Sequence, residues 1–180
     1  MSKQSPKLLS LSAFAAVSVL GLVLVAPGCG DGEAADDTCH DYSGFNGMSP
    51  TVGFSADVLP IFRNSCGLST ACHSQESGPV GQPFLGPPTA DGMVTAAQLM
   101  AIQTQNVGVA STKAGTMKIV DPGKPESSFL MHKMDGTLKC ADVTCESGCG
   151  SMMPLGAAMP LAADQRDIVR RWIAQGAKND

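Results

Sequence analysis

The sequence lacks the patterns that most directly mark an enzyme or a β-protein. It contains no phosphate-binding glycine loop, no HExxH zinc motif and no recognisable Ser-His-Asp set, and the apolar–polar alternation typical of strands is scarce. No segment repeats along the chain. Turn-forming residues are abundant instead, with 20 Gly and 12 Pro, so regular structure is restricted to short pieces. These features predict an all-α domain with long irregular loops and give no indication of catalysis.

The first 28 residues have the pattern of an export signal. Lys3 and Lys7 precede an apolar run from Leu8 to Ala26, and small residues then lead to Cys29. This arrangement resembles a bacterial lipoprotein signal, in which the cysteine is lipidated and tethers the mature chain to a membrane surface. An uncleaved anchor is the alternative, because the run is nearly long enough to span a bilayer. Both alternatives place the chain in the cell envelope, on the periplasmic or outer face.

The segment after Cys29 is acidic and rich in Gly and Ala. Residues 29–50 are therefore expected to form a flexible tether for a single domain over residues 51–180. Without residues 1–28 the chain has 10 basic and 16 acidic side chains, a net charge of -6. Because nucleic-acid binding requires a basic face, nucleic acid is not an expected partner.

Four segments of the domain have helical patterns: residues 55–64, 95–103, 125–134 and 162–175. Ser55 is the expected N-cap of the first, and Gly136 the expected stop after the third. The last segment has the clearest periodicity, with apolar residues from Ile168 to Ile173 on one face. Its Trp172 is expected either to anchor the helix in the core or to pack against a cofactor.

Seven cysteines in an exported chain need partners, because free thiols do not persist in an oxidising compartment. Cys29 is assigned to the lipid. Cys66 and Cys72, with His73 directly after them, have the order in which a chain attaches a c-type haem: the thiols form thioethers, and the imidazole lies under the iron. The other four are then expected to form two disulfides: Cys39, Cys140, Cys145 and Cys149. Three disulfides among all six would satisfy the count equally well.

Met153 is the candidate for the second iron ligand. A methionine thioether is a soft ligand for haem iron, and Met153 lies in a loop about 80 residues after His73, shortly before the last helix. Met152, Met159 and His132 are the alternative candidates for the same position.

Several blocks of the chain resemble small bacterial c-type cytochromes. The blocks are Phe54-Ser-Ala-Asp-Val-Leu-Pro-Ile-Phe62, Val120-Asp-Pro-Gly-Lys-Pro-Glu-Ser-Ser-Phe129, Met153-Pro154 and Trp172-Ile-Ala-Gln-Gly-Ala177. The resemblance implies a cytochrome c-like helical fold with haem c on Cys66 and Cys72, His73 as the proximal ligand and Met153 as the distal ligand. It departs from the usual Cys-x-x-Cys-His spacing in the five residues between the cysteines. The implied activity is electron transfer to redox partner proteins, without catalysis.

Two other functions stay open. If Cys66 and Cys72 pair with each other, the chain is a haem-free, disulfide-stapled lipoprotein that acts as a binding or scaffold module. Ten methionines raise copper handling as a third possibility. The spacing of Cys140, Cys145 and Cys149 is also compatible with a zinc knot, although export and the lack of a matching histidine favour disulfides.

Overall fold

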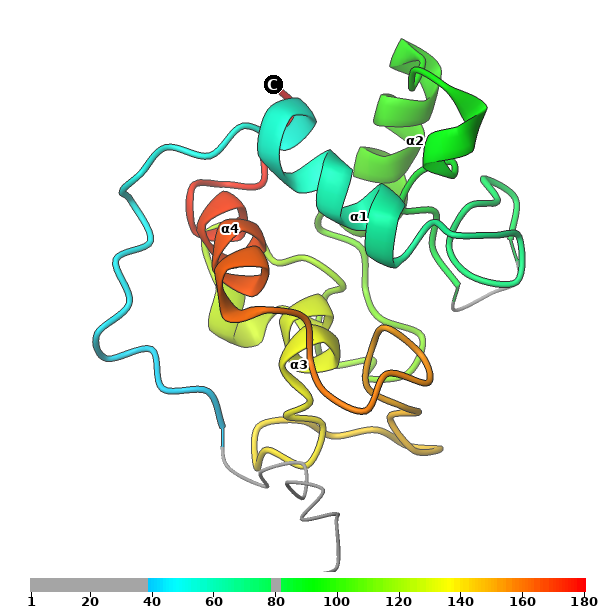
Figure 1. Cartoon of the computed structure of the whole chain (residues 1–180). Helices are drawn as coiled ribbons and strands as arrows, with labels where there is room; N and C mark the ends of the chain where they lie inside the picture. Colours follow the sequence, from blue (N-terminus) through cyan, green and yellow to red (C-terminus); the bar gives the residue numbers. More distant parts are fainter. Residues whose placement is uncertain (1–38, 79–81) are drawn as a thin grey trace, which may run out of the picture. The chain divides into compact units, whose positions relative to one another are not determined.

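The computed structural model describes residues 39–78 and 82–180; the expected signal segment and Cys29 lie outside this part. The described chain forms four α-helices, α1 (Leu59–Ser65), α2 (Ala96–Asn106), α3 (Phe129–Asp135) and α4 (Ala163–Ala174) (Figure 1). Three short turns of helix accompany them: η1 (Phe54–Val58), η2 (Thr89–Asp91) and η3 (Pro125–Ser127). Among the described residues, β-pairing is limited to isolated bridges. The predicted all-α class is confirmed, with long irregular segments between the helices.

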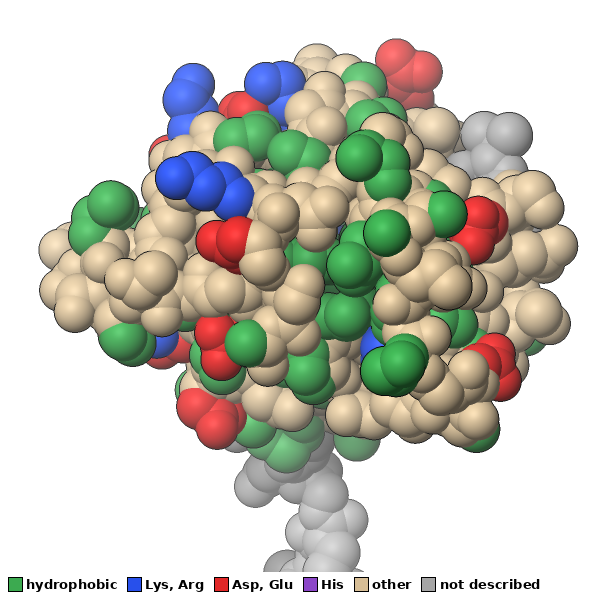
Figure 2. All heavy atoms as spheres, turned by 90° about the horizontal axis from the view of Figure 1, so that it is seen from above, with side chains coloured by type: hydrophobic (Ala, Val, Ile, Leu, Met, Phe, Trp, Pro, Cys, Tyr) green, Lys and Arg blue, Asp and Glu red, His purple; other side chains and the backbone are tan. Residues whose placement is uncertain are grey.

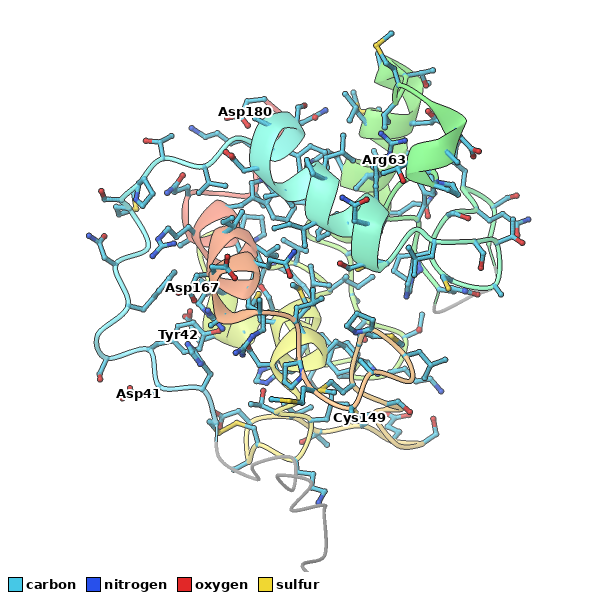
Figure 3. The ribbon with its side chains drawn as sticks, in the orientation of Figure 1. Asp41, Tyr42, Arg63, Cys149, Asp167 and Asp180 are labelled. Atoms are coloured by element: carbon cyan, nitrogen blue, oxygen red, sulfur yellow. A yellow bond between two sulfur atoms is a disulfide. The ribbon has the colours of Figure 1, made fainter. Side chains whose placement is uncertain are left out.

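The first helix is held at its start by the end of the chain. The π-helical turn η1 continues directly into α1, so residues 54–65 form one helix, and Pro60, which has no N–H to donate, lies where the π-helical turn passes into the α-helix. The prediction of Ser55 as N-cap is wrong, because Ser55 lies inside the helix. The free N–H groups at its start find acceptors on Asp180 instead: Phe54 donates to Oδ1 (2.8 Å) and Ser55 to the main-chain oxygen (3.0 Å) (Figure 3).

Local signals set the ends of α2 and α3. Thr95 and Gln98 form a capping box, in which the Gln98 N–H donates to Thr95 Oγ1 (3.2 Å) and the Thr95 N–H to Gln98 Oε1 (2.9 Å). The helix ends at Asn106, three residues later than predicted. Its side-chain amide donates to the carbonyl of Phe84 (2.8 Å), which ties α2 to the segment before it. Gly136, with φ +75°, ends α3 as predicted.

Three aromatic rings join the first and last helices. The ring centroid of Trp172 on α4 lies 5.3 Å from that of Phe54 and 6.1 Å from that of Phe62. Trp172 is buried, and its indole N–H donates to the carbonyl of Lys178 (2.8 Å). Of the two roles expected for Trp172, the structure shows the anchor of the last helix in the core.

A buried ion pair joins α3 to α4. Asp135, at the end of α3, accepts hydrogen bonds from Arg170 Nη2 at 2.7 and 2.9 Å and from Arg166 Nη1 at 2.6 Å. The side chains of Asp135 and Arg170 are 2% and 1% exposed, so the pair is removed from water. Asp167 also bonds Arg170. Arg170 is thus a buried cation that pairs with carboxylates of both α3 and α4.

Residues 39–50 are fastened to the domain, in contrast to the tether expected over 29–50. Cys39 is bonded to Cys140, and the Gln175 side chain donates to the carbonyls of Gly47 and Pro50, each at 2.9 Å. The ring of Tyr42 lies 5.5 Å from the guanidinium of Arg170 (Tyr42 is labelled in Figure 3). The domain boundary drawn at residue 51 is thus too late, and the described chain is part of the domain from residue 39 onward.

Cys39, Cys140, Cys145 and Cys149 form two disulfides, the number predicted for these four residues. Besides Cys39–Cys140, which links positions 101 residues apart, Cys145 is bonded to Cys149. Two sulfurs and a carboxylate cluster at Cys39, Cys140 and Asp142, but both sulfurs belong to one disulfide. The zinc-knot alternative for these cysteines therefore has no thiolates in the structure.

On the face seen in Figure 2, hydrophobic side chains gather near the centre and charged side chains lie mostly toward the edge. Several large apolar residues are well exposed on the domain, among them Met48, Leu68, Met93, Leu155 and Met159. Within residues 39–78 and 82–180, no helix has the length and apolar character needed to cross a bilayer.

Candidate cofactor site

A cavity of about 640 Å³ opens between the loop after α1, the end of α2, one side of α3 and the loop before α4. Pockets of roughly 300–1,000 Å³ are the usual size for small molecules and cofactors. Apolar side chains form most of its wall, among them Leu85, Ile119, Leu130 and Leu161. The lining also contains Cys66, Cys72, His73 and Met153, so the structure brings together four residues that the sequence singled out.

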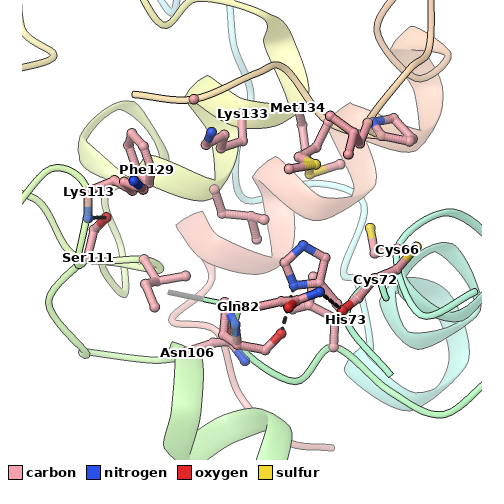
Figure 4. A pocket seen from close by; sticks show the side chains of 18 of the residues that line it. Cys66, Cys72, His73, Gln82, Asn106, Ser111, Lys113, Phe129, Lys133 and Met134 are labelled. Carbon is pink, nitrogen blue, oxygen red and sulfur yellow. Dashed lines mark hydrogen bonds between the residues drawn. The ribbon is translucent and has the colours of Figure 1, made fainter. Parts of the chain in front are cut away.

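The wide gap between the two cysteines is folded into a closed loop. The N–H of His73 donates to the carbonyl of Cys66 (3.0 Å), and the N–H of Cys72 donates to the carbonyl of Ser69 (2.9 Å). The loop ends therefore meet, and both thiols line the same cavity beside the imidazole (Figure 4). The side chain of Gln82, which also lines the cavity, fixes the end of this loop by donating to the carbonyls of Ala71 and Cys72.

His73 is held in one tautomer. Its Nδ1 lies 2.8 Å from the carbonyl oxygen of Pro83, which can only accept, so Nδ1 carries the proton and Nε2 keeps a lone pair. Burial lowers the pKa of His73 and keeps the imidazole neutral, although the bond to Pro83 opposes this shift. A ring N–H donated to a backbone carbonyl is the arrangement that orients a metal-binding histidine. No described residue bonds Nε2, so this nitrogen is available to a ligand of the cavity.

Cys66 and Cys72 are free thiols in the structure. Burial raises the pKa of Cys66 to about 12, with a smaller contribution from Cys72 beside it. Cys72 is more exposed, and the Ser69 hydroxyl donates to its sulfur at 3.6 Å. The structure therefore does not contain the alternative disulfide between Cys66 and Cys72. The sulfur of Cys72 is more accessible to solvent than that of Cys66.

Of the four candidates for the second ligand, Met153 is the one that lines the cavity. The side chain of Met152 packs against Gly136, where an added Cβ would lie 2.9 Å from its sulfur. Met159 is 66% exposed and is not part of the lining. His132 is buried on α3, with Nδ1 bonded to Thr137 Oγ1 (2.9 Å) and Nε2 to the carbonyl of Glu126 (3.2 Å). Both of its ring nitrogens are therefore occupied within the fold.

Lys133 on α3 holds the segment that leads to Met153. Its ammonium group donates to the carbonyls of Cys149 and Ser151, and its own carbonyl accepts the N–H of Met153 at 2.8 Å. The ammonium also lies 5.3 Å from the ring centroid of Phe129. Burial lowers the pKa of Lys133, and the positive charge of Lys113 lowers it further. An otherwise irregular segment is thereby fixed on α3 by one residue.

Sequence reasoning missed many residues of the cavity lining, among them Asn106, Lys133 and Met134. Met134 lies on α3, and its side chain is buried in the cavity wall. Asn106 uses its amide group within the chain, but its buried Oδ1 has no partner among the described residues. A buried acceptor without a partner points to a group that the chain itself does not supply. No motif marks these residues, because they meet only in the folded chain.

Comparison with models of protein families, with curated proteins and with solved structures gave no match to this chain.

Proposed function

We propose that this chain is a c-type cytochrome, an exported electron carrier that holds one covalently bound haem in the cavity described above. The observation that carries the proposal is the convergence of Cys66, Cys72, His73 and Met153 on one apolar cavity, with His73 Nε2 unprotonated and without a partner in the described chain. A cytochrome c-like arrangement of the helices belongs to the same proposal.

Each of the four residues has a defined task in this proposal. Cys66 and Cys72 would hold the haem covalently: each thiol would form a C–S bond with one vinyl group, and the thiol hydrogen would go to the neighbouring vinyl carbon. His73 would supply a nitrogen ligand in an orientation that Pro83 fixes. Met153 would supply a soft thioether ligand, and a His/Met pair raises the reduction potential. Bound haem supplies one-electron chemistry at its iron, while the apolar wall limits the access of water.

The proposal extends to the position of the protein in the cell. Cys29, after the apolar run from Leu8 to Ala26, would carry the lipid that tethers the domain to a membrane surface of the envelope. The electron donors and acceptors would then be other redox proteins of the envelope. The net charge of -6 outside the signal segment continues to disfavour nucleic acid as a partner.

Haem staining of the denatured protein tests the proposal. The full chain is produced in cells with working cytochrome maturation, denatured, separated from free haem and stained. A stained band that persists in the wild type and disappears in the Cys66→Ala/Cys72→Ala variant supports covalent haem at these positions. A matched Cys145→Ala/Cys149→Ala variant should keep the stain, because that disulfide lies outside the attachment loop. A colourless wild-type band would refute the proposal and favour the haem-free binding or scaffold module.

A further inference from the structure

The charge of the cavity lining is opposite to that of the chain. The whole sequence has 16 acidic and 12 basic residues, yet the described residues that line the cavity include Lys113 and Lys133 and no Asp or Glu. A cavity with ammonium groups and no carboxylate of its own favours an anionic ligand. The roles proposed for Cys66, Cys72, His73 and Met153 do not explain why the lining carries these two lysines.

The two lysines lie at one end of the cavity. Figure 4 shows Lys113 and Lys133 on either side of Phe129, away from Cys66 and Cys72. Lys113 is exposed, and the turn that carries it is fixed by Ser111, whose hydroxyl accepts the N–H of Lys113 at 3.2 Å. Lys113 makes no ion pair within the described chain.

The ammonium group of Lys133 retains capacity for a ligand. Two of its three N–H groups are used by the carbonyls of Cys149 and Ser151, which leaves one donor free. Lys113 and Lys133 belong to the same lining, which contains no Asp or Glu among the described residues, so their positive charges repel each other. A carboxylate at this end of the cavity would relieve this repulsion and accept a charge-assisted hydrogen bond.

We propose that Lys113 and Lys133 bind the propionate carboxylates of the haem, at the end of the cavity opposite the thioether attachments. This inference rests on the proposed function and deepens it. Haem carries its vinyl groups on one edge of the ring and its two propionates on the opposite edge. A ring whose vinyl edge meets Cys66 and Cys72 therefore presents its carboxylates toward the two lysines.

The experiment compares two forms of the same ring without covalent attachment. The Cys66→Ala/Cys72→Ala full chain is titrated with ferric haem and with ferric haem dimethyl ester in one detergent buffer, and binding is followed by absorbance. The two ligands share iron, ring and vinyl groups, and only the first has carboxylates. We expect the diacid to bind more tightly than the diester. Lys113→Gln should weaken diacid binding about two- to fivefold, the range of an exposed ion pair, and leave diester binding unchanged.

Three further variants sharpen the result. Lys113→Arg should restore the preference for the diacid, and Lys113→Gln/Lys133→Gln should abolish it. Lys124→Gln makes the same charge change at an exposed residue outside the cavity lining, and should have no effect. Because Lys133 also holds the segment before Met153, the single Lys113 variants decide the outcome.

Two results would overturn the proposal, and they are distinguishable. If both ligands bind but the preference for the diacid is unchanged in Lys113→Gln and persists in the double lysine variant, the lysines are not the carboxylate site, and the haem cavity itself stands. If neither ligand binds to the Cys66→Ala/Cys72→Ala chain, the haem site fails, and the lysine assignment fails with it.

Discussion

The ion pair between Asp135 and Arg170 gives the sharpest prediction for the fold beneath the cavity. Asp135→Asn keeps the shape of the side chain and removes its charge. Arg170, with 1% of its side chain exposed, would then keep only Asp167 as a carboxylate partner, and the Asp167 side chain is 39% exposed. Removing one partner of a buried pair costs about 3–5 kcal/mol. The remaining partner favours the lower end, so the expected loss of unfolding free energy is about 3 kcal/mol.

The same substitution at the surface serves as a control. Lys118 and Asp121 form an ion pair at 2.6 Å, as short as the Arg166–Asp135 contact, but the Lys118 side chain is 47% exposed. Exposed pairs contribute about 0.2–1 kcal/mol, so Asp121→Asn should cost less than about 1 kcal/mol. The contrast between the two variants isolates the effect of burial, because the chemical change is the same.

Urea unfolding of the haem-free chain provides the measurement. Trp172 is the one tryptophan of the sequence and is buried on α4, so its fluorescence reports the unfolding of the helix that carries Arg170. For a domain near 150 residues, 3 kcal/mol corresponds to a fall of roughly 10 °C in the melting temperature. Equal losses for Asp135→Asn and Asp121→Asn would refute the argument from burial. An Asp135→Leu/Arg170→Met variant should recover much of the stability, because the charges that lose a partner, Arg166 and Asp167, are partly exposed to water.

Three further predictions concern the cavity and its borders. In the reduced, haem-free protein near neutral pH, iodoacetamide should alkylate Cys72 well before Cys66, whose pKa is raised to about 12, and mass spectrometry of the two peptides would show the order. Equal rates would contradict the burial of Cys66. In the haem-loaded protein, Met153→Leu should change the low-spin absorption spectrum and lower the reduction potential, whereas Met159→Leu should change neither. Gly136→Ala should lower the unfolding free energy by about 1–2 kcal/mol in urea titrations, because φ is +75° there; an unchanged midpoint would be incompatible with the left-handed end of α3.

The helices were predictable where the signal is local. The apolar face from Ile168 to Ile173 and the glycine at 136 depend on neighbours within one or two turns, and α4 and the end of α3 follow them. The start of the first helix was not predictable in this way. Its N–H groups are accepted by Asp180, which is 126 residues from Phe54 along the chain, so the nearby Ser55 is not needed as a cap.

Composition misled the prediction for residues 39–50. The acidic residues that suggested a solvated tether lie before residue 39, and the only acidic residue of 39–50 is Asp41. This segment is bonded through Cys39 and packed through Tyr42 onto Arg170. The useful signal was Cys39 itself, because a disulfide requires its segment to lie on the domain. The partner of Cys39 was not predictable, since four cysteines allow three pairings.

The candidate site divides in the same way. Cys66, Cys72 and His73 are adjacent in sequence, so a motif identifies them, and Met153 was found from its place before the last helix. Asn106 and Lys133 come from separate helices and have no pattern of their own. Their roles depend on how α2 and α3 approach the loops, which a local pattern does not contain.

The two sides of the cavity are built by different means, and this difference bears on how the proposed iron ligands would be held. On the His73 side, the N–H of His73 donates to the carbonyl of Cys66, and the N–H of Leu85 donates to the carbonyl of His73. These backbone hydrogen bonds close the loop without a disulfide. On the Met153 side the chain has no helix between residues 136 and 162, and the segment is held by Cys145–Cys149 and by Lys133. A disulfide that closes so short a loop removes little conformational entropy from the unfolded chain. The Cys145–Cys149 disulfide therefore acts only on its own loop. The hydrogen bond from the N–H of Met153 to the carbonyl of Lys133 is the contact that fixes the position of Met153 along α3.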